Sequence, residues 1–376
     1  MGQTIPIPEI AVSATALAAS LAGGGDGSAL PMEAHRGAKT PLQFTGAGPE
    51  LRALVEDAGV FDLGYRTFLR ATGKDRVRWL NGMITQAVKF MVPGQTGYTL
   101  VLNPQGRIQG DGDVYCFEDF LLLETDRFQA EPLLTHLRRF IIMDDVRLDE
   151  LDAATTAIGI AGPRAAGILQ SLGGGVPEAE HFGTTRLADL EVRLVRGYSP
   201  IVPKFEIHVA AEQVLILWKA LIRAGATPCG VAATEDLRVF EGLPQYSVDF
   251  GDRQLPQETN LQRALNFTKG CYIGQEIVER IRSRATVHRS LRQFELHGTA
   301  PRLQPGEKIE LRAGDAAAGE LTSVARIELE GVHKTLALGI ARVEALEQAA
   351  TEPLQYDGGK AVPFVLPPDP AADPES

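Results

Sequence analysis

The chain has 376 residues, of which 44% are hydrophobic and 23% are charged, a balance typical of a globular protein with about two or three domains. Its formal net charge of -11 argues against nucleic-acid binding, and its three widely spaced cysteines argue against a zinc site or a disulfide framework. The cysteine pattern fits a reducing, cytoplasmic compartment best. No apolar run reaches the length of a membrane span, so we expect no membrane partner.

The N-terminal stretch, residues 1–46, is rich in Gly, Pro, Ala and Ser, and this composition predicts an irregular segment. The part from Ile10 to Leu30 has the apolar look of a signal peptide. It lacks a basic start, because the first arginine is Arg36, and its apolar residues are mostly Ala. We therefore predict a mobile or irregular N-terminus rather than a leader.

Residues 47–286 alternate between helical and extended patterns. Leu51, Leu54, Val55 and Ala58 have helical spacing, and Gly59 ends that helix. The elements predicted after it are, in chain order, an extended segment at 60–71, a helix at 74–83, strands at 97–102, 108–117 and 120–124, a helix at 127–140, strands at 146–151 and 157–161, a helix at 163–169, strands at 186–195 and 204–209, and helices at 212–224 and 235–240. Two similar rounds of strands and helices indicate an α+β fold with a pseudo-repeated sheet.

Residues 287–366 have a different pattern, with short strands separated by Gly and Pro turns. The predicted strands lie at 291–296, 308–311, 319–329 and 335–343. Such a run of short strands predicts a small all-β domain, in the form of a barrel. The Pro-, Ala- and acid-rich tail at 367–376 predicts disorder.

One short motif carries most of the functional information. It consists of Lys269, Gly270, Cys271, Tyr272, Ile273, Gly274, Gln275 and Glu276. Ile273 and Ile277 have helical spacing, so we predict a helix over 271–281 with the thiol of Cys271 at its start, where unpaired backbone N–H groups favour a reactive thiolate. The alternative is a buried cysteine that acts as a small hydrophobic side chain.

The string KGCYIGQE, preceded by LPQETNL at 255–261, resembles the signature of YgfZ-type folate-binding proteins in the glycine-cleavage T-protein, or aminomethyltransferase, superfamily. The resemblance extends from about Gly59 to Val343 and includes further landmarks at 59–63, 92–95, 102–106, 237–243, 319–323 and 337–341. It implies a ring of two α/β folate-binding subdomains plus a small C-terminal β-barrel around a folate pocket. It also implies binding of tetrahydrofolate, or a one-carbon-substituted form, and partners among iron–sulfur client or assembly proteins. No metal-ligand set comes with it.

The resemblance places four side chains at the folate. Glu206 matches a folate-contacting glutamate, and its carboxylate suits the adjacent N–H and amino groups of a pterin ring. Arg238 matches an arginine that pairs with a carboxylate or with the pterin oxygen, while Tyr98 and Tyr198 supply a ring face or a hydroxyl. The alternatives are a structural ion pair for the two charged residues and simple packing for the tyrosines. We predict that Glu206 and Arg238 face one cavity and that Cys271 borders it.

Two departures from the T-protein pattern concern the reaction. Where T-proteins have two adjacent aspartates, this chain has Gly110 followed by Asp111, so only Asp111 remains as a catalytic candidate besides Cys271. A glycine-rich loop is replaced by residues 199–204. The resemblance therefore favours a folate-binding protein that supports iron–sulfur proteins without classical aminomethyl transfer. The alternatives are a folate-dependent aminomethyltransferase or related one-carbon transferase, and an interaction protein with a vestigial pocket.

Overall fold

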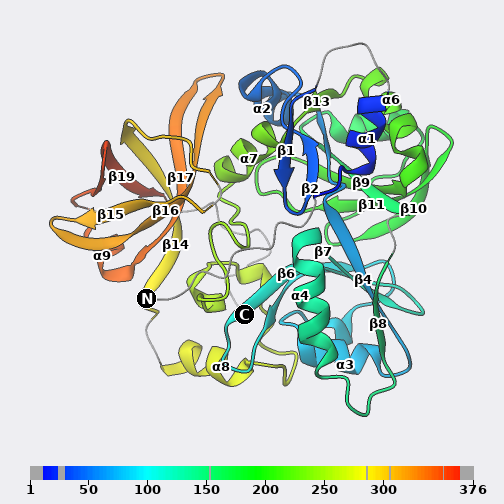
Figure 1. Ribbon diagram of the computed structural model, residues 1–376, viewed down its shortest axis with the longest axis horizontal. Helices are drawn as coiled ribbons and strands as arrows, with labels where there is room; N and C mark the ends of the chain where they lie inside the picture. Colours follow the sequence, from blue (N-terminus) through cyan, green and yellow to red (C-terminus); the bar gives the residue numbers. More distant parts are fainter. Residues whose placement is uncertain are drawn as a thin grey trace.

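The computed structural model describes residues 12–23, 30–151, 154–284, 287–304, 306–349 and 351–364. The chain forms two helix-covered sheets and a closed β-barrel, and Figure 1 shows the barrel to the left of the sheets. This arrangement confirms the predicted α+β class. Among the described residues, none of the helices combines the length and the apolar character needed to cross a bilayer.

The N-terminal prediction is wrong within the described residues. Helix α1 (Ala16–Gly23) is followed by a hairpin of β1 (Met32–His35) and β2 (Ala38–Pro41). Leu17 is fully buried in the core beneath the six-stranded sheet, and helix α1 packs against helix α6. Packing against the rest of the protein stabilises this short helix, since helices of this length are marginal alone.

The first sheet has six strands in the order β10-β11-β12-β9-β3-β13. Its strands are β3 (Gly59–Asp62), β9 (Thr155–Ala161), β10 (Phe182–Leu187), β11 (Leu190–Gly197), β12 (Lys204–Ala210) and β13 (Thr227–Cys229), and α1, α5 (Ala165–Ser171) and α6 (Val214–Arg223) cover one face. The single strand predicted at 186–195 is instead the hairpin β10–β11. Its turn residues Ala188 and Asp189 have φ values of 47° and 66°, and Ala is not a residue that signals such a turn.

The second sheet has five strands in the order β5-β6-β7-β4-β8. Its strands are β4 (Arg66–Thr72), β5 (Thr96–Leu102), β6 (Ile108–Cys116), β7 (Leu121–Asp126) and β8 (Arg147–Glu150), and helices α3 (Arg76–Met83) and α4 (Arg127–Arg138) pack on it. The strands predicted at 97–102 and 108–117 are β5 and β6, and a tight turn joins them, with the Gly106 N–H donating to the Asn103 carbonyl at 2.9 Å. The extended segment predicted at 60–71 divides between the two sheets, because β3 and β4 pair with different neighbours.

The barrel confirms the all-β prediction for the C-terminal region. It closes in the order β14-β17-β16-β15-β18-β19, from β14 (Arg289–Gly298), β15 (Ile309–Ala313), β16 (Ala316–Leu329), β17 (Val332–Arg342), β18 (Leu354–Tyr356) and β19 (Gly359–Phe364), with helix α9 (Val343–Gln348) between β17 and β18. Helices α2 (Ala47–Glu56) and α7 (Val231–Phe240) contact both the six-stranded sheet and the barrel strand β16. The tail predicted to be disordered, 367–376, lies outside the described residues.

The segment between α7 and the barrel packs on the edge of the five-stranded sheet. It contains two short 3-10 turns, η3 (Pro256–Glu258) and η4 (Gln262–Ala264), and helix α8 (Gln275–Arg284). The side chains of Leu261 and Val278 are buried against Leu100, Leu102 and Ile108 of β5 and β6. This packing brings the motif region beside the turn that joins those two strands.

Candidate functional site

A cavity of about 560 Å³ lies between the two sheets and helix α7. Its walls come from β3, β4, β5, β6, β7, β11, β12 and α7, so segments far apart in the sequence meet there. The cavity is lined by five residues predicted from the sequence, namely Tyr98, Asp111, Tyr198, Glu206 and Arg238. The expectation that Glu206 and Arg238 face one cavity is confirmed.

Strand β6 presents alternate side chains to the cavity. Asp111, Asp113 and Tyr115 line it, whereas a Cβ at Gly110 would lie 2.8 Å from Gln129 and Leu133 of helix α4 on the other face. The inference that Gly110 removes a carboxylate from the pocket is therefore wrong, because position 110 points away from it. The pocket keeps two carboxyl groups on this strand, at 111 and 113.

Asp111 is held in place from both sides. Its carboxylate accepts hydrogen bonds from the Tyr98 hydroxyl at 2.6 Å and from the Gln129 side-chain amide at 2.8 Å. Within the described part of the chain Asp113 has no side-chain hydrogen bond of this kind, and burial raises its pKa to about 6 although the nearby Arg263 acts in the opposite direction. One carboxylate on β6 is thus fixed as an acceptor, while the other changes charge close to neutral pH.

Glu206 lies on β12 between two cationic groups. Its Oε2 accepts from the Arg66 guanidinium at 2.5 Å, and its Oε1 lies 3.6 Å from the Lys204 ammonium. Glu206 is only 5% exposed. The two neighbouring cations compensate the free-energy cost of burying its carboxylate. Because a carboxylate offers about four acceptor positions, Glu206 retains capacity toward a ligand in the cavity.

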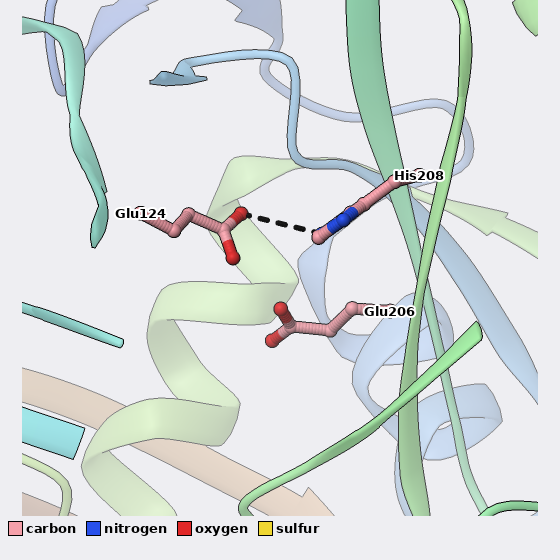
Figure 2. Close-up of side chains that lie close together, drawn as sticks. All are labelled: Glu124, Glu206 and His208. Carbon is pink, nitrogen blue, oxygen red and sulfur yellow. Dashed lines mark ion pairs between the residues drawn. The ribbon is translucent and has the colours of Figure 1, made fainter. Parts of the chain in front are cut away.

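Glu124, Glu206 and His208 form a buried cluster that the sequence analysis did not anticipate (Figure 2). One oxygen or nitrogen from each lies within 4.8 Å of the others, and Glu124 Oε1 is 3.5 Å from His208 Nε2. The Arg66 guanidinium, 3.5 Å from Glu124 and bonded to Glu206, already supplies positive charge there. Burial acts to raise the pKa of Glu124, but His208 and Arg66 outweigh it and bring that pKa down to about 2.

A signal for this cluster existed in the sequence. On β12 the polar residues Lys204, Glu206 and His208 alternate with Phe205 and Ile207, which are buried against the helices. Such alternation places the three polar side chains on one face of the strand. The partners Glu124 and Arg66 gave no comparable signal, since they lie on other strands far away in the chain.

Arg238 has a structural place at the cavity wall. Its guanidinium donates to the Glu235 carboxylate with Nε and Nη2, to Asp249 Oδ2 at 2.6 Å and the Leu243 carbonyl at 3.0 Å with Nη1, and to the Ser323 hydroxyl of β16 at 2.9 Å with Nη2. These bonds engage all five N–H groups of an arginine. Arg238 therefore joins α7 to the barrel, which is the structural ion-pair interpretation, and retains no donor for a ligand.

Arg263 is a cavity residue that the sequence analysis missed. Its guanidinium carbon lies 4.0 Å from the ring centre of Tyr98 and 4.1 Å from that of Tyr198. The two predicted tyrosines thus present their faces to this arginine. No motif pointed to Arg263, because the contact joins η4 to two different sheets.

The motif cysteine does not lie where the sequence placed it. Helix α8 begins at Gln275, four residues after Cys271, and Cys271 is exposed and absent from the cavity lining. The prediction of a thiol at the helix start and at the edge of the cavity is therefore wrong. The φ values of +92° at Gly270 and +80° at Gly274 keep the intervening residues out of the helix.

Other motif residues attach this loop to the five-stranded sheet. The buried Lys269 ammonium donates to the carbonyl of Ile84 at 2.5 Å and to that of Gln86 at 2.6 Å. Burial lowers the pKa of Lys269 to about 7. Gly274 packs so closely on the β5–β6 turn that a Cβ there would lie 2.7 Å from the Asn103 carbonyl. Tyr272 is buried, and Glu276 is exposed in the first turn of α8.

The comparisons with known proteins agree with one another. A family model described as the GCVT N-terminal domain matches residues 29–269. The chain is 29% identical over 258 residues to an aminomethyltransferase of Nostoc sp., covering 65% of this chain and 67% of that protein. It is 28% identical over 279 residues to an aminomethyltransferase of Rippkaea orientalis, covering 70% of this chain and 73% of that protein.

A solved structure shares the fold. The glycine cleavage system aminomethyltransferase T from Bartonella henselae superposes with a TM-score of 0.77 at 18% identity, covering 89% of this chain and 92% of that one. At this identity the likeness shows a common fold of α/β subdomains and barrel, and no more.

Proposed function

This chain belongs to the family of the GCVT N-terminal domain, within the glycine-cleavage T-protein superfamily, and on that premise we propose that it binds a tetrahydrofolate in its central cavity. The observation that carries the proposal is the convergence of Glu206, Asp111 and two tyrosines on one cavity of about 560 Å³. Cavities of this size suit a ligand with a fused ring and a flexible tail.

Glu206 is the residue we assign to the pterin ring. A pterin presents an N–H and an amino group side by side, and a buried carboxylate accepts both. Arg66 and Lys204 keep Glu206 ionised and fix its direction. Arg238, which the sequence paired with Glu206, supports the wall of the pocket instead.

For the reaction we propose a folate-dependent one-carbon transfer, the chemistry for which the aminomethyltransferase relatives are named. Asp111 and Asp113 both face the cavity, so the pocket has the carboxylates that such a transfer needs beside a developing positive charge. Asp113, with its pKa raised to about 6 by burial, is suited to accept or release a proton near neutral pH.

Anaerobic titration calorimetry with tetrahydrofolate tests the binding. The wild type is expected to bind, and Glu206→Gln to bind about 10- to 100-fold more weakly, since it loses charge-assisted hydrogen bonds. Formation of methylene-tetrahydrofolate from an aminomethyl donor, compared between the wild type, Asp111→Asn and Asp113→Asn, tests the reaction. Binding without any such product would retain the folate site and reject the transfer.

A second function is favoured by one specific observation, the octapeptide at 269–276 with its exposed Cys271. The motif resembles the signature of the YgfZ-type branch, whose members support iron–sulfur proteins, and we propose that the exposed thiol outside the folate cavity contacts a client or assembly protein. A deletion strain complemented with Cys271→Ser tests this role. Full recovery of iron–sulfur enzyme activity with the serine variant would reject it.

A further inference from the structure

The cavity contains more negative than positive side chains. Eight acidic residues line it, namely Asp111, Asp113, Glu124, Asp126, Glu180, Glu206, Glu235 and Glu241. Six basic residues line it, namely Arg36, Arg66, Arg196, Lys204, Arg238 and Arg263. A carboxylate of a ligand bound in this cavity therefore needs a cation that no protein carboxylate already holds.

Four of the six basic residues already pair with carboxylates of the protein. Arg66 and Lys204 pair with Glu206, and all five N–H groups of Arg238 have acceptors in the protein. Arg36 lies 3.6 Å from Asp126 and 3.8 Å from Glu235.

Arg196 and Arg263 remain, and they differ in position. Arg196 pairs in register with Phe205 and lies over its ring at 4.6 Å. Phe205 is fully buried among the helices, on the opposite face of the sheet from Glu206. The guanidinium of Arg196 is thus stacked on a buried ring of the helix-covered face, and among the described basic residues of the lining Arg263 is the one left to meet a ligand.

Arg263 presents a specific edge to the cavity. Tyr98 and Tyr198 contact its guanidinium carbon at 4.0 and 4.1 Å, so rings cover the guanidinium group. Its Nε is buried, and the described part of the chain offers it no hydrogen-bond acceptor. With its faces covered, a guanidinium makes directed hydrogen bonds through its N–H edge, which is the geometry that binds a carboxylate with two parallel bonds.

The surroundings fix this arginine before a ligand arrives. The Tyr98 ring is held by its hydroxyl on Asp111, and the Thr85 hydroxyl donates to the carbonyl of Ala264, next to Arg263 in η4. Ala264 is fully buried. A side chain ordered in advance loses less entropy on binding, so its bonds to a ligand contribute more to affinity.

We propose that Arg263, held between Tyr98 and Tyr198, binds a carboxylate of the glutamate tail of the folate. This inference rests on the proposed function, because it assigns the charged end of the ligand whose ring we place at Glu206. Asp113 lies near enough to influence Arg263 electrostatically but forms no ion pair with it within 4.0 Å, so the guanidinium edge remains available.

The test compares two ligands, tetrahydrofolate and its glutamate diamide, which has the same shape without the two carboxylates. Anaerobic calorimetry measures both with the wild type, Arg263→Gln and Arg263→Lys. We expect the wild type to prefer tetrahydrofolate about 10- to 100-fold, as charge-assisted hydrogen bonds imply. Arg263→Gln should remove that preference and leave the affinity for the diamide within about twofold of the wild-type value. Arg263→Lys retains only part of it, because an ammonium lacks the two-pronged edge.

The control is Arg223→Gln, which removes the same charge from an exposed position in the last turn of α6 and leaves both affinities unchanged. Equal weakening of both ligands by Arg263→Gln, or equal affinity of the wild type for both, overturns the assignment. If Arg263→Gln does not fold, an unchanged preference in Arg263→Lys overturns it. A wild type that binds neither ligand rejects the proposed function itself.

Discussion

The central cavity and the motif loop at 269–276 are built in opposite ways. The cavity collects residues from seven strands and helix α7, and none of them belongs to the octapeptide. The loop is one continuous string of sequence, yet Lys269 and Gly274 are used to attach it to the β5–β6 region, and Cys271 is its exposed point. The most distinctive motif of the sequence therefore lies in a loop outside the cavity, and the cavity is lined by residues from other parts of the chain.

The same contrast separates two arginines in the pocket. Arg238 belongs to a recognisable sequence element and is saturated by protein acceptors. Arg263 belongs to no recognisable element and has its donors left for a ligand. Polar residues that hold the walls together and polar residues that meet a ligand line the same cavity, and only their hydrogen-bond partners tell them apart.

The largest expected effect concerns Arg238. Arg238→Met leaves the buried carboxylate of Asp249 and the partly buried carboxylate of Glu235 without this partner, so the free energy of unfolding should fall by about 3–5 kcal/mol. Urea denaturation followed by tryptophan fluorescence measures this. The control is Arg312→Met, which removes an exposed ion pair on the barrel and should leave the urea midpoint of unfolding unchanged. An Arg238→Met protein of normal stability that no longer binds tetrahydrofolate would instead make Arg238 a ligand residue.

The second prediction tests whether the motif loop is attached through Gly274. Gly274→Ala places a Cβ 2.7 Å from the Asn103 carbonyl at a φ of +80°, and we expect a loss of about 2–3 kcal/mol in unfolding free energy. Gly270→Ala is the matched control, since its φ is +92° but no atom lies within 4 Å of the added Cβ. Its loss should stay near 1 kcal/mol. Equal losses for the two variants would contradict a packed contact at Gly274.

The third prediction concerns Asp113 and pH. Its pKa is raised from 3.8 to about 6 in the folded protein, so its protonated form stabilises the fold below pH 4 and that stabilisation is lost as the pH rises through 6. At pH 7.5, Asp113→Asn should be about 1–2 kcal/mol more stable than the wild type, a figure reduced from the full shift because the side chain is partly exposed to the cavity.

The difference between Asp113→Asn and the wild type should close below pH 4. Thermal unfolding at pH 3.5, 5.5 and 7.5 measures it. Asp315→Asn removes the same charge from an exposed position on the barrel and should follow the wild type at each pH. A constant difference at all three pH values would mean that Asp113 does not titrate in this range.

The smallest expected effect concerns Cys271. Because its side chain is exposed and lies outside the cavity, Cys271→Ser should change neither the unfolding midpoint nor tetrahydrofolate affinity. Alkylation at pH 7.5 should label Cys271 at least about 10-fold faster than Cys116 and Cys229, whose pKa values burial raises. Mass spectrometry of timed samples gives the three rates. A Cys271 that reacts no faster than the buried cysteines would leave the loop a structural role only.

The sequence by itself determined several features of this protein. Period-2 patterns and turn residues placed most strands, including the β5–β6 hairpin, and the change of pattern after residue 286 predicted the barrel. The resemblance to a known family predicted Glu206 and the two tyrosines at a folate pocket and Asp111 as a catalytic candidate. These features depend on residues close together in the chain or on a motif, so they can be predicted from the sequence alone.

Only the tertiary structure decided the partners of the charged groups. Arg66 meets Glu206 across 140 positions of sequence, and Arg238 meets Ser323 across 85. The helix at Ala16–Gly23 likewise depends on burial of Leu17, and the position of Cys271 depends on where Gly270 and Gly274 turn the chain. The energy of a buried charge is set by the groups packed around it, and those groups come from strands that the sequence does not show to be neighbours.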